Sequence, residues 1–179
     1  MVHRSLFTVH SSWVTVHCSE GPMRFIADRN LGKLVKELRK LGYDTVYYRS
    51  DDLYGLMCIA RQEDRTILTR NTRLRPRRPE DKVVRIIEDV PREQLRQLIK
   101  EGLLSLDRDR LLSRCLLCND LLERIAHEEA QGRVPDYTFH QQEDFFRCPR
   151  CERIYWKGSH HENMERSIQA LFGREEELV

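Results

Sequence analysis

Four of the six cysteines form two C-x-x-C pairs, Cys115 with Cys118 and Cys148 with Cys151. A C-x-x-C turn presents two thiolates from one tight loop, and two such turns can fill the four tetrahedral positions that zinc prefers. A redox-active dithiol needs only one pair, at a junction between a strand and a helix, and neither pair has that setting. The spacing therefore predicts a zinc ion held by four thiolates, which leaves no position for a substrate water and makes the metal structural.

Carboxylates are the second group of residues that could do chemistry. Asp28 follows the short, mostly apolar run 23–27, and Asp51 and Asp52 stand just before a helical pattern. Oxygen ligands of this kind hold magnesium or manganese, and these cations keep water molecules that can be used for hydrolysis. Taken alone, Asp52 has the position of a helix N-cap. As a set with Asp28 the acidic residues could hold a cation, so the cap and the ligand interpretations both stay open.

A strand followed at once by a helix positions Asp28. Residues 23–27 read as a buried strand, and apolar residues recur with helical spacing over 31–41. Asn30 is the expected N-cap of this helix and Gly42 its expected end. A strand that feeds a helix in this way places Asp28 at the carboxyl edge of a sheet, where open α/β folds bind their ligands.

Strands and helices keep alternating along the next sixty residues. The predicted strands are 45–48, 65–69 and 82–87, and the predicted helices are 53–60 and a segment that begins at Pro91. Alternation of this kind implies parallel pairing with right-handed crossovers, so we expect a three-layer α/β domain with a mainly parallel sheet over residues 23–102.

The remaining segments divide the chain further. We expect residues 1–22 to be an N-terminal extension or an added strand, 103–114 a connecting segment, and 115–179 a small zinc ribbon with a C-terminal helix. Within the ribbon, 127–131 could make one helical turn, and 132–136 reads as loop.

Composition bounds the class of protein. Charged residues make up 34% of the chain and hydrophobic residues 40%, without an apolar run of about 18 residues, so no membrane span is predicted. Cysteines paired for metal binding, with no export signal, indicate a reducing compartment, and we expect a cytoplasmic location. The net charge of +2 says little about partners, but five arginines crowd into 70–78. That segment must lie on the surface, as a phosphate-binding or simply a solvated loop.

Five stretches together resemble the Mut-seven C-terminal ribonuclease family, in which a PIN-like nuclease domain is fused to a zinc ribbon. They are RFIADRNLGKLVKELRKLGYD, SDDLYGLMCIA, RTILTRNTRL, CLLCN and CPRCERIYWKGSHHENM. The resemblance implies an RNA-cleaving enzyme that uses magnesium or manganese. In that family pattern Asp28 corresponds to the acidic ligand after the first strand, and Asp51 or Asp52 to the acidic position that opens the next helix.

The third family carboxylate follows the threonine and arginine that end the third strand, and here that position is Asn71. Asparagine has the same shape and can offer a carbonyl oxygen, but it carries no charge and cannot act as a base. We therefore expect weaker magnesium binding. The chain could be a poor nuclease, a binding relic or an inactivated variant.

A phosphate-facing surface is the third expected site. The candidates for RNA binding are Arg29, Lys33, Arg70, Arg73, Arg75, Tyr155, Trp156 and Lys157, with Arg147, Arg150 and Arg153 from the ribbon beside them. The aromatic rings could stack on unpaired bases, or they could simply pack the small ribbon core. The alternatives to a nuclease are a non-catalytic RNA-binding module and a protein-interaction module. The oligomeric state stays open.

Overall fold

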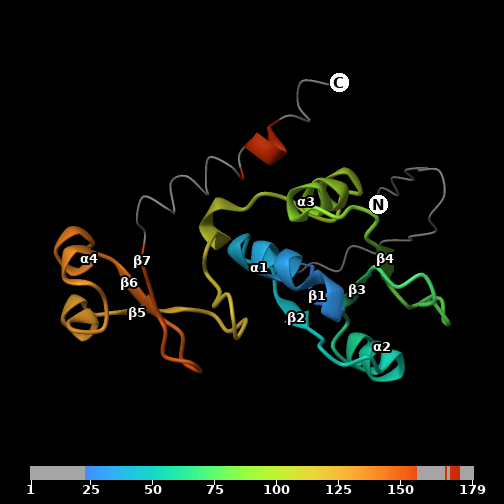
Figure 1. Cartoon of the computed structure of the whole chain (residues 1–179), viewed down its shortest axis with the longest axis horizontal. Helices are drawn as coiled ribbons and strands as arrows, with labels where there is room; N and C mark the ends of the chain where they lie inside the picture. Colours follow the sequence, from blue (N-terminus) through green and yellow to red (C-terminus); the bar gives the residue numbers. More distant parts are fainter. Residues whose placement is uncertain (1–22, 157–167, 169, 174–179) are drawn as a thin grey trace, which may run out of the picture.

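The computed structural model describes residues 23–156, 168 and 170–173 (Figure 1). The predicted N-terminal extension, residues 1–22, and the RNA-binding candidate Lys157 lie outside the described residues. None of the helices in the described part is long and apolar enough to cross a bilayer.

A four-stranded parallel sheet forms the centre of the α/β domain. Its strands are β1 (Phe25–Ala27), β2 (Thr45–Tyr47), β3 (Thr66–Thr69) and β4 (Val83–Arg85), in the order β2-β1-β3-β4. Each neighbouring pair is parallel, with Ile26 of β1 opposite Val46 and Ile67. The predicted parallel α/β architecture is confirmed, and β1 occupies a central position with a neighbour on each side.

Helices cover both faces of this sheet. On one face α1 (Gly32–Lys40) and α3 (Pro91–Lys100) enclose a core with Phe25 and Leu68, and on the other α2 (Leu53–Gln62) packs over Ile26 and Ile67. Figure 1 shows α2 across the sheet from α1 and α3. Successive residues of β1 thus point into different cores, as the period of two of a strand requires.

The start of the first helix differs from the prediction. A turn of 3-10 helix, η1 (Arg29–Leu31), precedes α1, and the residue that caps it is Asp28, not Asn30. The Asp28 side chain accepts a hydrogen bond from the Asn30 N–H at 2.9 Å. The predicted end at Gly42 is confirmed: this residue has φ +83°, and a Cβ there would come within 2.2 Å of the Arg110 carbonyl oxygen.

The segment that carries the cysteine pairs, called the ribbon from here on, contains a three-stranded antiparallel sheet of β5 (Glu123–Ile125), β6 (Phe145–Arg147) and β7 (Ile154–Trp156). The expected helical turn is present as η3 (His127–Ala130). A short helix, α4 (Asp136–Gln141), begins within the stretch that the sequence marks as loop. None of the residues of α4 is buried, so it has no apolar stripe that a sequence pattern could reveal.

Two segments outside residues 23–102 pack against the α/β domain. Leu103 and Leu104, ahead of the short helix η2 (Arg108–Arg110), are buried in the core beneath α1 and α3. Ile168 and Leu171 are buried in the same core, and Figure 1 shows their helical segment near α3. Ile168 and Leu171 therefore pack on the α/β domain, and the division of the chain into domains at these boundaries stays a prediction.

Candidate functional site

The two C-x-x-C pairs come together at the start of the ribbon. The four sulfur atoms all lie within 4.8 Å of one another, and Cys115 and Cys148 are fully buried. The Sγ atoms of Cys115 and Cys151 are 3.7 Å apart. Tetrahedral zinc with Zn–S bonds of about 2.3 Å requires sulfur atoms about 3.8 Å apart. The cluster therefore has the ligands and the size that zinc needs.

The two cysteine loops have the same backbone conformation. The residue after the second cysteine of each pair has a positive φ, 73° at Asn119 and 57° at Glu152. Its N–H donates to the carbonyl of the first cysteine, at 2.9 Å in both loops. This turn folds each loop back on itself and directs both of its sulfur atoms to one point, as a zinc-binding knuckle requires.

Tyr155, on β7, contacts this cluster directly. Its hydroxyl oxygen lies 3.2 Å from the Cys115 Sγ. Burial opposes ionisation of Cys115, but the Tyr155 hydroxyl and the backbone N–H groups of Cys118 and Leu117 lower the pKa of this thiol to about 6. Burial and the contact with Cys115 raise the pKa of Tyr155, so its hydroxyl stays protonated at neutral pH. Tyr155 therefore supports the cysteine cluster, whereas Trp156 keeps 37% of its surface exposed.

Asp28 lies at the carboxyl end of β1, as predicted, with only 6% of its surface exposed. Besides the bond from the Asn30 N–H, its Oδ2 accepts hydrogen bonds from the Thr69 hydroxyl at 2.6 Å and from the Arg70 N–H at 3.0 Å. These bonds fasten the end of β1 to the end of β3. A carboxylate has about four lone-pair positions, so three hydrogen bonds leave it able to accept one more partner.

Asn71 belongs to the same network. Its N–H donates to the Thr69 Oγ1 at 2.9 Å, so the chain of hydrogen bonds runs from Asn71 through Thr69 to Asp28. Its side-chain oxygen accepts from the Arg73 N–H at 2.9 Å. The structure thus brings together two of the predicted catalytic positions, which are far apart in the sequence.

The other two carboxylates have different partners. Asp51 is exposed and pairs with Arg29, with 2.5 Å between Nη1 and Oδ2. Asp52 caps α2 by accepting from the Tyr54 N–H at 3.0 Å, so the cap interpretation is confirmed. Within the described ranges, the four cysteines are the only group of three or more metal-ligating side chains close enough to share an ion. A magnesium or manganese site at Asp28 and Asp51 or Asp52 stays a prediction.

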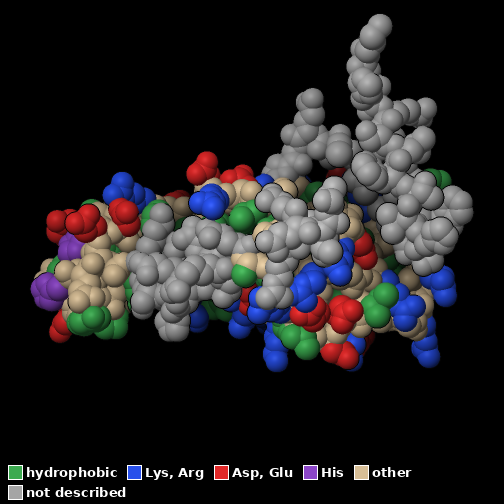
Figure 2. Space-filling model, turned by 90° about the horizontal axis from the view of Figure 1, so that it is seen from above, with side chains coloured by type: hydrophobic (Ala, Val, Ile, Leu, Met, Phe, Trp, Pro, Cys, Tyr) green, Lys and Arg blue, Asp and Glu red, His purple; other side chains and the backbone are tan. Residues whose placement is uncertain are grey.

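A groove of about 590 Å³ lies along α1. Asn30 and Arg70, whose N–H groups bond Asp28, line it, but Asp28, Asp51 and Asp52 do not. Its lining includes the predicted RNA-binding residues Lys33 and Arg70, whereas Arg73 and Arg75 are exposed on the following loop and do not line it. Figure 2 shows basic side chains in blue, with acidic ones among them, over the α/β domain.

Three charged residues of the groove, Lys36, Arg49 and Asp89, were not singled out as site candidates from the sequence. Asp89 lies past the end of β4 and pairs with Arg70, and Arg49 lies 5.2 Å from the centre of the Tyr47 ring. The signal for Asp89 was its place after a predicted parallel strand, the same argument that identified Asp28.

A family model, that of the Mut7-C RNAse domain, matches residues 23–168. The chain belongs to this family. The match to the Mut7-C RNAse domain takes in the whole parallel sheet, Asp28, Asn71 and both cysteine pairs, so it supports a nuclease-like role and an RNA substrate. No curated protein and no solved structure matches the chain. The resemblance noted from the sequence is confirmed at the level of the family.

Proposed function

We propose that this chain is a divalent-metal-dependent ribonuclease that hydrolyses RNA phosphodiester bonds with a PIN-like α/β domain, next to a ribbon held by structural zinc. One observation carries the proposal: in a chain of the Mut7-C RNAse domain family, the nearly buried Asp28 carboxylate lies at the carboxyl end of the central strand β1. That end of a parallel sheet is where open α/β folds place their ligands. A cytoplasmic location belongs to this proposal, because zinc-binding cysteines stay reduced there.

Asp28 and Asp51 are the residues that would hold magnesium or manganese, with Asp52 beside them. Magnesium is commonly bound by one or two carboxylates together with substrate phosphates, so a complete cage of protein ligands is not needed. When bound, the cation would activate water and offset charge on the phosphate. The hydrogen bonds from Thr69 and Arg70 fix the orientation of the Asp28 carboxylate and leave one lone-pair position for a metal.

Arg29 and Arg70 flank Asp28 in the sequence and across the sheet, and each is paired with an exposed carboxylate, Asp51 and Asp89 respectively. Exposed ion pairs contribute only about 0–1 kcal/mol, so a phosphate can displace them at little cost. In this mechanism an RNA phosphate binds the guanidinium of Arg29 in place of Asp51, and the Asp51 carboxylate then becomes available to the cation.

Non-catalytic RNA binding is the second candidate function. The observation that favours it is Asn71, whose neutral side chain stands at the position of the third family carboxylate and whose backbone N–H bonds Thr69, the partner of Asp28. In this case the groove along α1 would still bind phosphates, but Asp28 and Asp51 alone would carry too little negative charge to hold a cation.

The deciding experiment compares the wild-type chain with Asn71→Asp on a mixed pool of structured and single-stranded RNA in manganese. Aspartate can keep the turn that Asn71 makes with the Arg73 N–H, so the variant should fold. We expect Asn71→Asp to cut at least about tenfold faster, a gain of about 1.4 kcal/mol in transition-state stabilisation. Adding Asp51→Asn to this variant should abolish the gain, and Asp51 is exposed, so its loss should not impair folding.

Failure of all forms to cut, in magnesium and in manganese, would refute the nuclease proposal. RNA binding by the same preparations would then establish the non-catalytic function. Zinc content, measured on each preparation, is the control for correct folding.

A further inference from the structure

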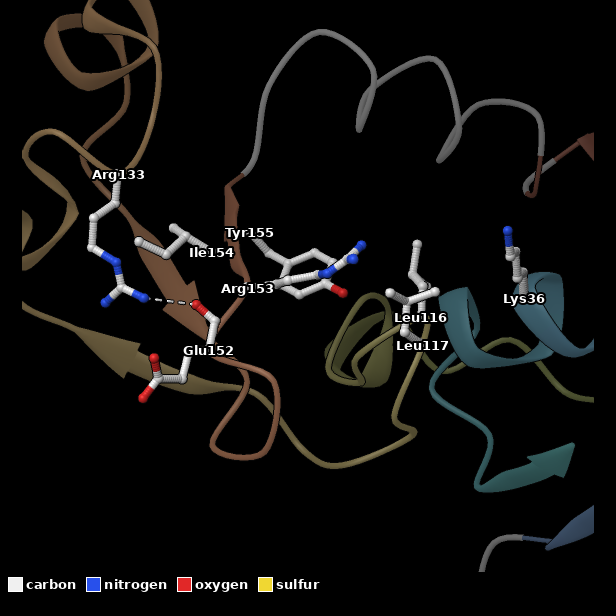
Figure 3. Close-up of a pocket in the computed structure, with 8 residues that line it drawn as sticks. All are labelled: Lys36, Leu116, Leu117, Arg133, Glu152, Arg153, Ile154 and Tyr155. Atoms are coloured by element: carbon white, nitrogen blue, oxygen red, sulfur yellow. Dashed lines mark hydrogen bonds between the residues drawn. The ribbon is translucent and has the colours of Figure 1, made fainter.

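A second hollow, of about 520 Å³, lies between α1 and the ribbon. Lys36 lies at one end and Arg133 at the other, with Arg153 and Tyr155 between them (Figure 3). Lys36 and Leu117 line this hollow and also the groove along α1. The two depressions therefore meet and form one continuous path from Arg70 to the ribbon.

Basic side chains predominate along the whole path. We call the six cationic residues that line it the basic path; they are Lys33, Lys36, Arg49, Arg70, Arg133 and Arg153. The two acidic residues in the lining are Asp89, which pairs with Arg70, and Glu152. Figure 3 shows the Glu152 carboxylate turned away from Lys36 and Arg153. The interior of the path is therefore positively charged, which suits a chain of phosphates.

The path is held in shape where the two parts of the protein join. Arg39 is buried in α1, and its guanidinium donates to the carbonyls of Leu116 and Leu117 at 2.9 and 2.8 Å. Leu117 lies at the point where the two hollows meet. Because α1 itself fixes this loop of the first cysteine pair, the path exists before any ligand binds.

We propose that the basic path binds a single strand of RNA, which runs from Arg70, next to Asp28, across α1 to the ribbon. Proteins that bind single strands combine a positive groove, which follows the backbone, with aromatic faces for the bases. Tyr47 lines the first hollow and Tyr155 the second. Each hollow has the volume of a small-molecule pocket, about 300–1,000 Å³, which is enough for individual nucleotides. The single-strand geometry comes from the path, and RNA as the ligand rests on the proposed function.

The test uses the zinc-loaded full chain and fluorescence anisotropy with labelled RNA strands of about 4–16 nucleotides, the range of known single-strand sites. Magnesium and manganese are left out, so binding is measured without hydrolysis. The variant is Lys36→Gln with Arg153→Gln; both side chains are exposed, so their neutralisation should not disturb folding. Lys100→Gln, on the exposed end of α3 and outside the path, is the matched control.

We expect the double variant to reduce the slope of log affinity against log salt by about 1.4, because each phosphate contact on a single strand contributes about 0.7. The loss should be larger for long strands, which span both hollows, than for short ones. The Lys100→Gln control should leave the slope unchanged.

An unchanged slope in the double variant would overturn the proposal, and so would equal affinity for duplex RNA of the same length. These outcomes are separate from failure of the nuclease proposal. If the protein cleaves RNA but the double variant has an unchanged salt slope, only the proposal for the basic path is refuted. If the double variant lowers the slope as expected but no form of the protein cleaves RNA, only the nuclease proposal is refuted.

Discussion

Asn119 connects the first cysteine pair to the edge of the parallel sheet. Its side-chain oxygen accepts from the Thr45 N–H at 2.9 Å, and its side-chain nitrogen donates to the Asp44 Oδ1 at 2.7 Å. Thr45 is fully buried at the start of β2. Asn119 also has a φ of 73°, a conformation that asparagine tolerates better than other residues with a Cβ. The Asn119→Ala variant removes both bonds and keeps the backbone conformation.

The cost can be worked out from these contacts. A buried N–H that loses its partner, here that of Thr45, costs about 1–3 kcal/mol. An alanine in the left-handed region adds about 1–2 kcal/mol. We expect Asn119→Ala to lower the free energy of unfolding by about 3 kcal/mol. The measurement is urea unfolding of the zinc-loaded protein, followed by circular dichroism, with the slope against urea checked for change.

Glu152 provides the matched control. It has the equivalent position in the second cysteine loop and a φ of 57°, but its carboxylate makes no hydrogen bond within the described residues. Glu152→Ala should therefore change the free energy of unfolding by less than about 1 kcal/mol. If Asn119→Ala and Glu152→Ala prove equally costly, the hydrogen bonds of Asn119 do not fasten the ribbon to the sheet, and the reasoning fails.

Two further predictions concern zinc and pH. Removal of the metal by a chelator should unfold the ribbon, because structural zinc supplies about 10–16 kcal/mol of apparent folding free energy. The rate of amide hydrogen exchange in β5, β6 and β7 should then rise sharply. Unchanged exchange rates would show that the cysteines need no metal. Burial alone would raise the pKa of Asp44, but hydrogen bonds from Arg65 and Asn119 outweigh it and lower this pKa to about 2. The carboxylate of an unfolded chain has a pKa of about 3.9, so Asp44 stabilises the fold fully above about pH 5, and this stabilisation is lost as the pH falls from about 4 to 2. Thermal melts across that range should show a shallower acid dependence in Asp44→Asn, and parallel curves would contradict this account.

The parallel sheet could be predicted because its signals are local. β1 and β3 are short buried runs, and the apolar spacing of α1 and α3 has the helical period. The cysteine cluster could be predicted for the same reason, since each C-x-x-C loop sets its own geometry. The 3-10 turn before α1 could not, because both Asp28 and Asn30 are good caps and only the path of the backbone decides between them.

The site was harder to predict because its contacts join distant parts of the chain. Nothing in the sequence indicates that Thr69 links Asp28 to Asn71, since that link depends on the parallel register of β1 and β3. The continuity of the basic path depends on Arg39, whose partners Leu116 and Leu117 are more than seventy positions away. A long-range hydrogen bond of a buried arginine has no local sequence pattern.

The hydrogen-bonded chain from Asp28 to Asn71 also gives a way to detect a cation without measuring cleavage. Asn71→Asp adds a second carboxylate to the residue whose backbone N–H bonds Thr69, the partner of the nearly buried Asp28, and two like charges that are near each other destabilise each other. A bound cation relieves that repulsion, so manganese should raise the melting temperature of Asn71→Asp much more than that of the wild-type chain. At a manganese concentration about 100 times the dissociation constant, the gain is about 2.7 kcal/mol. Adding Asp51→Asn should reduce the gain, because it removes a proposed ligand. If manganese shifts the wild-type chain and the Asn71→Asp variant equally, the ion binds elsewhere, and Asp28 acts only as the cap that joins β1 to β3.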